Sequence, residues 1–224
     1  MIGILGGTFD PVHFGHLRPA LELLEGLPLD ELRLLPCGVP PHRDAPAVSA
    51  AHRRAMLERA IDGQPGFRID TRELDRPGPS YMVDTLASLR EELGAACPIA
   101  LILGMDAFLG LPTWHRWERI PQLAHLLVME RPGARLPEDG PLAALVQTGR
   151  ADAAQALRES PSGRILTWSV TQLDISATRI RALVADGRSV RYLLPAAVND
   201  YIHEHGLYAE PRGFVGMAGR NVSR

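Results

Sequence analysis

Short apolar runs alternate along the chain with longer segments whose apolar residues recur every three to four positions. The short runs predict buried strands at 2–5, 32–37, 67–70, 99–104, 125–130 and 164–170. The longer segments predict helices at 15–25, 49–61, 80–93, 115–123, 141–158, 176–186 and 195–205. Strands that alternate with helices form βαβ crossovers, so the pattern predicts an α/β fold with a mostly parallel sheet.

The composition allows one domain of this kind. The chain has 224 residues, of which 46% are hydrophobic and 22% are charged, as in ordinary globular proteins. Neither an internal repeat nor a low-complexity linker interrupts the alternation. We therefore predict one Rossmann-like, doubly wound domain over 1–208, followed by a Gly- and Arg-rich C-terminal tail at 209–224.

Charge and cysteine content limit the expected binding partners and cellular location. A formal net charge of −2 gives no general attraction to nucleic acid or to an anionic membrane. No apolar run approaches the roughly 20 residues that span a bilayer, and no signal-peptide pattern opens the chain. Cys37 and Cys97 lack metal-binding or disulfide spacing, so we expect two core thiols and a reducing cytoplasm.

The stretch GGTFDPVHFGH follows the first predicted strand and runs into the first predicted helix. Gly6 and Gly7 allow the backbone to come close to a ligand. The helix that starts near Gly15 directs its free N–H groups and its positive dipole end toward the same place. Ligands of parallel sheets bind where strands lead into such helices, so the stretch predicts a phosphate site.

Two histidines, His13 and His16, lie three residues apart at this helix start. If both belong to the first turn they share a face, where imidazole N–H groups can donate to phosphate oxygens. Two alternatives remain open from the residues alone. The pair could be half of a metal site, with Asp10 as the nearest further ligand, or both rings could simply be satisfied polar side chains.

Together with PPHR at 40–43 and ISATRIR at 175–181, the GGTFDPVHFGH stretch resembles the HxGH signature of the nucleotidyltransferases, in the form found in bacterial nicotinate mononucleotide adenylyltransferases. The resemblance runs from Ile2 to about Tyr208. It implies attack by a mononucleotide phosphate on the α-phosphorus of ATP, with a dinucleotide and pyrophosphate as products. A phosphate monoester is already mostly dianionic at neutral pH, so this reaction needs aligned anions and charge stabilisation rather than a side-chain nucleophile.

The resemblance also assigns an ATP half of the site. His13 and His16 become the catalytic donors. Ser176 is a plausible helix N-cap, and Thr178 and Arg181 share a face of the helix that follows, where the family holds the β- and γ-phosphates. A capped amphipathic helix with solvated arginines is the plainer alternative. The remaining residues expected to bind ATP are Gly6, Gly7, Thr8, Phe9, Gly104 and Asp106.

The mononucleotide half rests on the resemblance more heavily. Trp114 is expected to stack on the pyridine ring, and His115 stands where many relatives have tyrosine. The proline-stiffened loop after the second strand is expected to reach the mononucleotide phosphate. No acidic residue lies in the PSYM helix start, and Asp84 is expected to point away. The residues assigned to this half are His42, Arg43, Tyr81, Thr85, Trp114, His115 and Arg131.

The expected partners are ATP and nicotinate mononucleotide, with neither nucleic acid nor a membrane. No complete carboxylate cage for a metal is visible in the sequence, which suits Mg²⁺ carried mainly by the ATP phosphates. Another small-molecule adenylyltransferase, such as one that acts on pantetheine phosphate, and an ATP-sensing module without turnover are the alternatives. The oligomeric state does not follow from the sequence.

Overall fold

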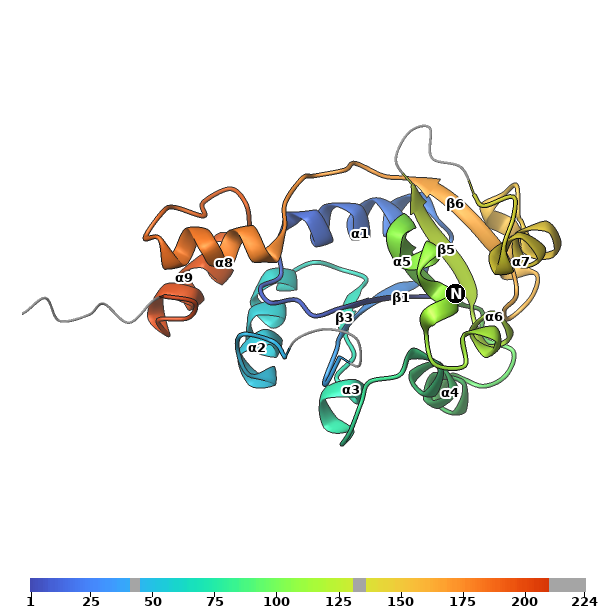
Figure 1. The fold of residues 1–224 in the computed structure, drawn as a ribbon, viewed down its shortest axis with the longest axis horizontal. Helices are drawn as coiled ribbons and strands as arrows, with labels where there is room; N and C mark the ends of the chain where they lie inside the picture. Colours follow the sequence, from blue (N-terminus) through green and yellow to red (C-terminus); the bar gives the residue numbers. More distant parts are fainter. Residues whose placement is uncertain (41–44, 131–135, 210–224) are drawn as a thin grey trace, which may run out of the picture.

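The computed structural model describes residues 1–40, 45–130 and 136–209. Within these ranges six strands form one sheet in the order β3-β2-β1-β4-β5-β6, and every neighbouring pair is parallel (Figure 1). The strands are β1 (Ile2–Gly7), β2 (Glu31–Pro36), β3 (Phe67–Ile69), β4 (Ile99–Gly104), β5 (His125–Glu130) and β6 (Ile165–Ser169). All six predicted strands and the parallel sheet are therefore confirmed.

The described helices cover both faces of this sheet. They are α1 (Phe14–Gly26), α2 (Ala50–Ile61), α3 (Arg72–Asp75), α4 (Met82–Leu93), α5 (Met105–Leu109), α6 (Ile120–Leu123), α7 (Pro141–Gly149), α8 (Ala177–Ala185) and α9 (Ala196–Glu204). Short 3₁₀ turns occupy Leu111–Thr113, Trp117–Arg119 and Ala154–Arg158. None of the helices in these ranges is long and apolar enough to cross a membrane.

Two apolar cores lie on opposite faces of the sheet, because successive strand side chains point to opposite sides. Leu5 packs in the core formed with α1, α2, α8 and α9, whereas its neighbour Ile4 packs in the core formed with α4 to α7. β4 is buried from Ile99 to Leu103, as expected for a strand covered on both faces. The doubly wound Rossmann-like prediction is confirmed.

Two predicted helices are shorter than the apolar pattern suggested. At 115–123, Arg116 takes a left-handed conformation with φ 51°, which a right-handed helix cannot include, so only a 3₁₀ turn and α6 form. At 141–158 the helix ends at Gly149, because the Ala151 N–H donates to the Ile165 carbonyl at 2.8 Å and extends the sheet edge. Local pairing with the sheet overrides the helical periodicity there.

Two further predictions have different outcomes. Cys37 and Cys97 are free but half-buried, so the expectation of core thiols is wrong, although burial raises the pKa of Cys37 to about 11. The division into a domain at 1–208 and a tail stays a prediction, because 210–224 lies outside the described residues.

Candidate active site

The predicted phosphate site lies where the strand order changes direction. Since every strand is parallel, all six carboxyl ends meet at one edge of the sheet, and β1 and β4 lie side by side at its centre. Gly6 and Gly7 end β1, and Gly104 ends β4. A Cβ added to Gly104 would meet no atom within 4 Å, so the end of β4 faces open space.

Phe9 shapes the loop between β1 and α1. Its backbone has a φ of 49°, which is unusual for a residue other than glycine, and its ring is 1% exposed. A Cβ on Gly7 would lie 2.9 Å from that ring, so the loop requires glycine at this position. Gly7 therefore serves the packing of Phe9 as well as any approach of the backbone to a ligand.

Arg53 stabilises this loop through a buried hydrogen bond, and it was not predicted as a site residue from the sequence. Its side chain is 1% exposed, and Nη1 donates to the Thr8 carbonyl at 2.8 Å. Burial lowers the pKa of Arg53, while the charge of Asp10 opposes the shift. One signal was available, because Arg53 lies three and four residues before Met56 and Leu57 on the buried stripe of α2.

His13 and His16 come together as predicted. His13 is the N-cap of α1 and His16 lies in its first turn, with ring centroids 3.8 Å apart. The His13 backbone N–H donates to His16 Nδ1 at 3.3 Å. Nδ1 is thus the acceptor, the ring proton belongs on Nε2, and Nε2–H is the donor that a phosphate oxygen can use.

Both histidines are neutral in the folded protein. Burial lowers the pKa of His13 to about 4, and burial together with the neighbouring His13 lowers that of His16 to about 3. Within the described residues, His13 Nδ1 is buried and has no hydrogen-bond partner. The histidine pair thus offers neutral imidazole groups rather than fixed positive charges, and one of its buried ring nitrogens, His13 Nδ1, is unpaired among the described residues.

These low pKa values predict an acid-sensitive fold. Between about pH 6.5 and pH 4 the unfolded chain binds protons at His13 and His16 that the folded chain does not, so stability falls as the pH falls through this window. We expect the loss of unfolding free energy from pH 7 to pH 5, measured by urea denaturation, to be smaller in His16→Ala. His203→Ala, which removes an exposed histidine of α9, is the control and should keep the wild-type slope. Equal slopes in all three proteins would contradict the expectation.

The predicted ATP-phosphate residues converge on the same place from α8. Ser176 caps this helix, and its Oγ accepts from the Arg179 N–H at 3.2 Å. Arg181 Nη2 donates to Thr178 Oγ1 at 3.3 Å, which confirms their shared face. A Cβ on Gly15 would lie 3.2 Å from the Ile175 carbonyl, so the starts of α1 and α8 are in contact.

Some of the residues assigned to the mononucleotide lie close together in the structure. The rings of Tyr81 and His115 lie 4.4 Å apart, and Trp114 is half-buried against the core beside α4. Tyr81 is the N-cap of α4, and the tip of Met82 would lie 3.3 Å from a Cβ on Gly6. The start of α4 therefore adjoins the phosphate loop. Asp106 is exposed in α5, at the end of β4.

Thr85 was expected to contact the mononucleotide, but its hydroxyl bonds to two other side chains of the protein. It is fully buried, its hydroxyl donates to Glu73 Oε1 at 2.7 Å, and it accepts from Arg76 Nη2 at 3.0 Å. Burial raises the pKa of Glu73, opposed by the Thr85 hydrogen bond and the charge of Arg76. Glu73 was missed because α3 is too short to show a buried face in the sequence. Asp84 is exposed, and its orientation away from the expected carboxylate stays a prediction.

His42, Arg43 and Arg131 lie outside the described residues. The segments beside the first two are placed: the backbone N–H groups of Gly38 and Val39 donate to Ser80 Oγ at 3.1 and 3.3 Å. Ser80 directly precedes Tyr81, so the loop after β2 leaves the sheet next to the start of α4.

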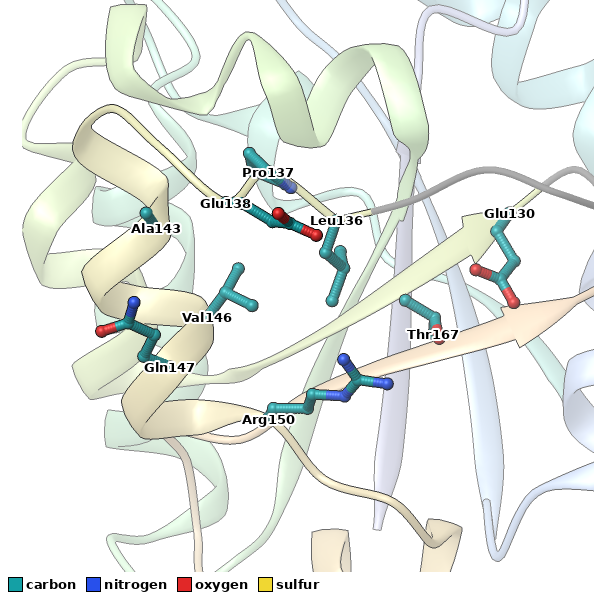
Figure 2. Close-up of a pocket in the computed structure, with 9 residues that line it drawn as sticks. All are labelled: Glu130, Leu136, Pro137, Glu138, Ala143, Val146, Gln147, Arg150 and Thr167. Carbon is teal, nitrogen blue, oxygen red and sulfur yellow. The ribbon is translucent and has the colours of Figure 1, made fainter.

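A cavity of about 720 Å³ lies elsewhere, between α7 and the ends of β5 and β6 (Figure 2). Glu130, Arg150 and Thr167 are among its lining residues, and no predicted site residue of the described ranges lines it. Over those same ranges, no cluster of three or more His, Cys, Asp or Glu side chains could hold a metal ion.

Comparison with known proteins agrees with this geometry. Residues 4–183 match the family model described as cytidylyltransferase-like. This span runs from β1 into α8 and so includes both helix starts that meet at the phosphate loop. The chain belongs to this family of nucleotidyltransferases.

Curated relatives indicate the group within this family to which the chain is similar. The chain is 53% identical to a protein of Halorhodospira halophila over 94% of this chain and 96% of the relative. It is 52% identical to one of Methylococcus capsulatus over 94% of this chain and 100% of the relative. Both are named "Probable nicotinate-nucleotide adenylyltransferase". Among nucleotidyltransferases, the chain therefore belongs with the bacterial nicotinate-nucleotide adenylyltransferases.

Solved structures support the fold independently of close sequence similarity. The nicotinic acid mononucleotide adenylyltransferase of Plasmodium falciparum complexed with NaAD matches with a TM-score of 0.69 at 16% identity, over 92% of this chain and 96% of that one. The same protein complexed with APC matches with a TM-score of 0.67 at 17% identity, over the same shares.

Proposed function

We infer that the chain transfers the adenylyl group of ATP to nicotinate mononucleotide, forming nicotinate adenine dinucleotide and pyrophosphate in NAD biosynthesis. The observation that carries this inference is the contact between the starts of α1 and α8 beside the glycine loop at the end of β1. Two helix N-termini and the neutral His13–His16 pair then surround one anion-binding place. The expected cytoplasmic location remains part of this proposal.

The proposed mechanism uses alignment and charge stabilisation. Ser176, Thr178 and Arg181 bind the β- and γ-phosphates of ATP, which become the leaving pyrophosphate. His16 Nε2–H donates to the α-phosphate, where charge grows as the mononucleotide oxygen attacks. No side chain has to form a covalent intermediate, because the dianionic phosphate of the mononucleotide is itself the nucleophile.

The second substrate is proposed to lie on the α4 side of the loop. Trp114 provides an aromatic surface for the pyridine ring, and the paired rings of Tyr81 and His115 are proposed to contact the same substrate. The start of α4 directs its N–H groups to the nicotinate carboxylate. We keep His42, Arg43 and Arg131 as expected contacts of the mononucleotide phosphate on the sequence resemblance alone.

Mg²⁺ is proposed to enter with ATP rather than in a protein cage. The side-chain oxygens of Asp10, the carboxylate nearest to the histidines in the sequence, accept from the Ala47 N–H and the Tyr208 hydroxyl and so are already engaged. Asp106 is the exposed carboxylate at the end of β4 that could contact such an ion or its water. When bound, Mg²⁺ neutralises part of the triphosphate charge.

A panel of acceptors tests the proposed function. Purified protein is incubated with ATP, Mg²⁺ and, separately, nicotinate mononucleotide, nicotinamide mononucleotide or pantetheine phosphate, and pyrophosphate and adenylylated products are measured. The proposal expects pyrophosphate and a dinucleotide with the nicotinate form. Product from pantetheine phosphate alone would favour the other adenylyltransferase class, and ATP binding without pyrophosphate would favour a sensing module.

Trp114→Ala tests the assigned stacking surface. Ring stacking is worth roughly 1–3 kcal/mol, so the KM for the mononucleotide should rise strongly while the KM for ATP changes little. Trp117→Ala is the control, since Trp117 is also half-buried against the same core but carries no assigned contact. Equal KM increases for both substrates would mark Trp114 as a packing residue only.

A further inference from the structure

Three segments that are far apart in the sequence converge on Asp10, which lies in the loop just before α1. Tyr208 Oη donates to Asp10 Oδ1 at 2.6 Å, and the Ala47 N–H donates to Oδ2 at 2.6 Å. Arg181 Nη1 donates to the Asp10 carbonyl at 2.7 Å. Asp10 is only 4% exposed, so these bonds form where bulk water competes little.

Two of these partners connect Asp10 to the two substrates. Arg181 belongs to the face of α8 assigned to the ATP phosphates, and its bond to the Asp10 carbonyl sets where its other donors point. Ala47 lies four residues beyond Arg43, which is expected from the sequence resemblance to contact the mononucleotide phosphate. The position of Asp10 therefore bears on how the two anionic substrates are aligned.

Tyr208 is the third partner and has no assigned contact with either substrate. It lies beyond the residues 4–183 that match the family model. Its backbone has a φ of 61°, a conformation that side chains other than glycine adopt when their surroundings hold them there. Burial and the adjacent Asp10 raise the pKa of Tyr208 well above its usual value, so its hydroxyl stays a donor.

We propose that Tyr208 is a positioning residue of adenylyl transfer, which holds Asp10 and the phosphate loop in the geometry that aligns the two substrate phosphates. The proposal rests on the function inferred above. A misplacement of reacting groups by about 1 Å can cost about 10²-fold in rate, so a bond outside direct substrate contact can affect turnover. The effect should fall on kcat, because the groups that bind each substrate remain present.

Tyr208→Phe and Tyr201→Phe form a matched pair. Tyr201 lies in α9, is 7% exposed, and its hydroxyl shares a 2.9 Å hydrogen bond with His52 Nδ1 rather than with a residue of the phosphate loop. Each variant loses one tyrosine hydroxyl bond and keeps its ring. We expect a modest loss of thermal stability in both, but a roughly ten- to hundredfold lower kcat only in Tyr208→Phe, with little change in either KM.

Asp10→Asn completes a double-mutant cycle. If the Tyr208 hydroxyl acts through Asp10, then Tyr208→Phe should lower kcat much less in the Asp10→Asn background than in the wild type, whereas independent effects would multiply. A wild-type protein that forms no dinucleotide would defeat the proposed function. An active wild type with equal kcat in Tyr208→Phe and Tyr201→Phe, or with multiplicative effects in the cycle, would overturn the role of Tyr208 alone.

Discussion

His16→Ala should leave the fold intact and lower kcat by about 10²–10³, the usual cost of losing one donor to charge that develops in the transition state. The reason lies in the hydrogen bond from the His13 backbone N–H to His16 Nδ1, which leaves Nε2–H as the donor. His16→Asn and His16→Gln are informative companions, since each carries a side-chain N–H but places it differently. Single-turnover kinetics with saturating substrates measure the effect on chemistry directly.

His203→Ala again serves as the control for loss of a histidine, because His203 is exposed on α9 and far from the glycine loop in sequence. Turnover near the wild-type value in a folded His16→Ala protein would remove His16 from the mechanism. The alternative of a metal site is tested in the same preparations. Stoichiometric zinc that resists a chelator and disappears in the variant would favour it over the phosphate role.

The second large effect is a preference for nicotinate mononucleotide over the nicotinamide form, on the order of 10²-fold or more in kcat/KM. The backbone N–H groups of Asp84 and Thr85 donate to the Tyr81 carbonyl, at 3.1 Å each. Those of Met82 and Val83 come before any intrahelical partner and are left for a carboxylate at the positive end of α4. An amide places an NH₂ group against one of these donors, which leaves it unpaired.

The buried carboxylate of Glu73 does not remove this preference. It accepts from the Thr85 hydroxyl, and the charge of Arg76 lies close to it.

Both mononucleotides should be assayed over the same concentration range, with ATP saturating, so that only the ring substituent differs. Comparable kcat/KM values for the two would refute the acid-specific assignment of α4 and leave adenylyl transfer itself standing.

The features predictable from the sequence are those with a local cause. Continuous apolar runs predict strands that are covered on both faces, and the parallel order of the sheet follows from the helices between them. The glycine loop, the His13–His16 face and the cap at Ser176 each depend on residues within a few positions of one another. In a parallel sheet, loops that follow the strands lie at the same edge, and the structure brings the starts of α1 and α8 together there.

The missed features depend on contacts across the fold. Arg53 reaches the Thr8 carbonyl across 45 positions, and Tyr208 reaches Asp10 across 198. Glu73 faces Thr85 only because the short helix α3 is packed beside α4. The helix predicted at 141–158 is too long for the same kind of reason, since Arg150 and Ala151 pair with Ile165 at the sheet edge and the helix ends at Gly149. Periodicity along the chain contains no information about such partners.

The most direct measurement follows the phosphorus atoms of ATP. Nicotinate mononucleotide is incubated with the protein, Mg²⁺ and ATP labelled either at the α- or at the γ-phosphorus, and the products are separated. Adenylyl transfer predicts that the α-label appears in nicotinate adenine dinucleotide and the γ-label in pyrophosphate, in equal amounts and only when the mononucleotide is present. Release of the γ-label as orthophosphate, or pyrophosphate without labelled dinucleotide, would contradict the account.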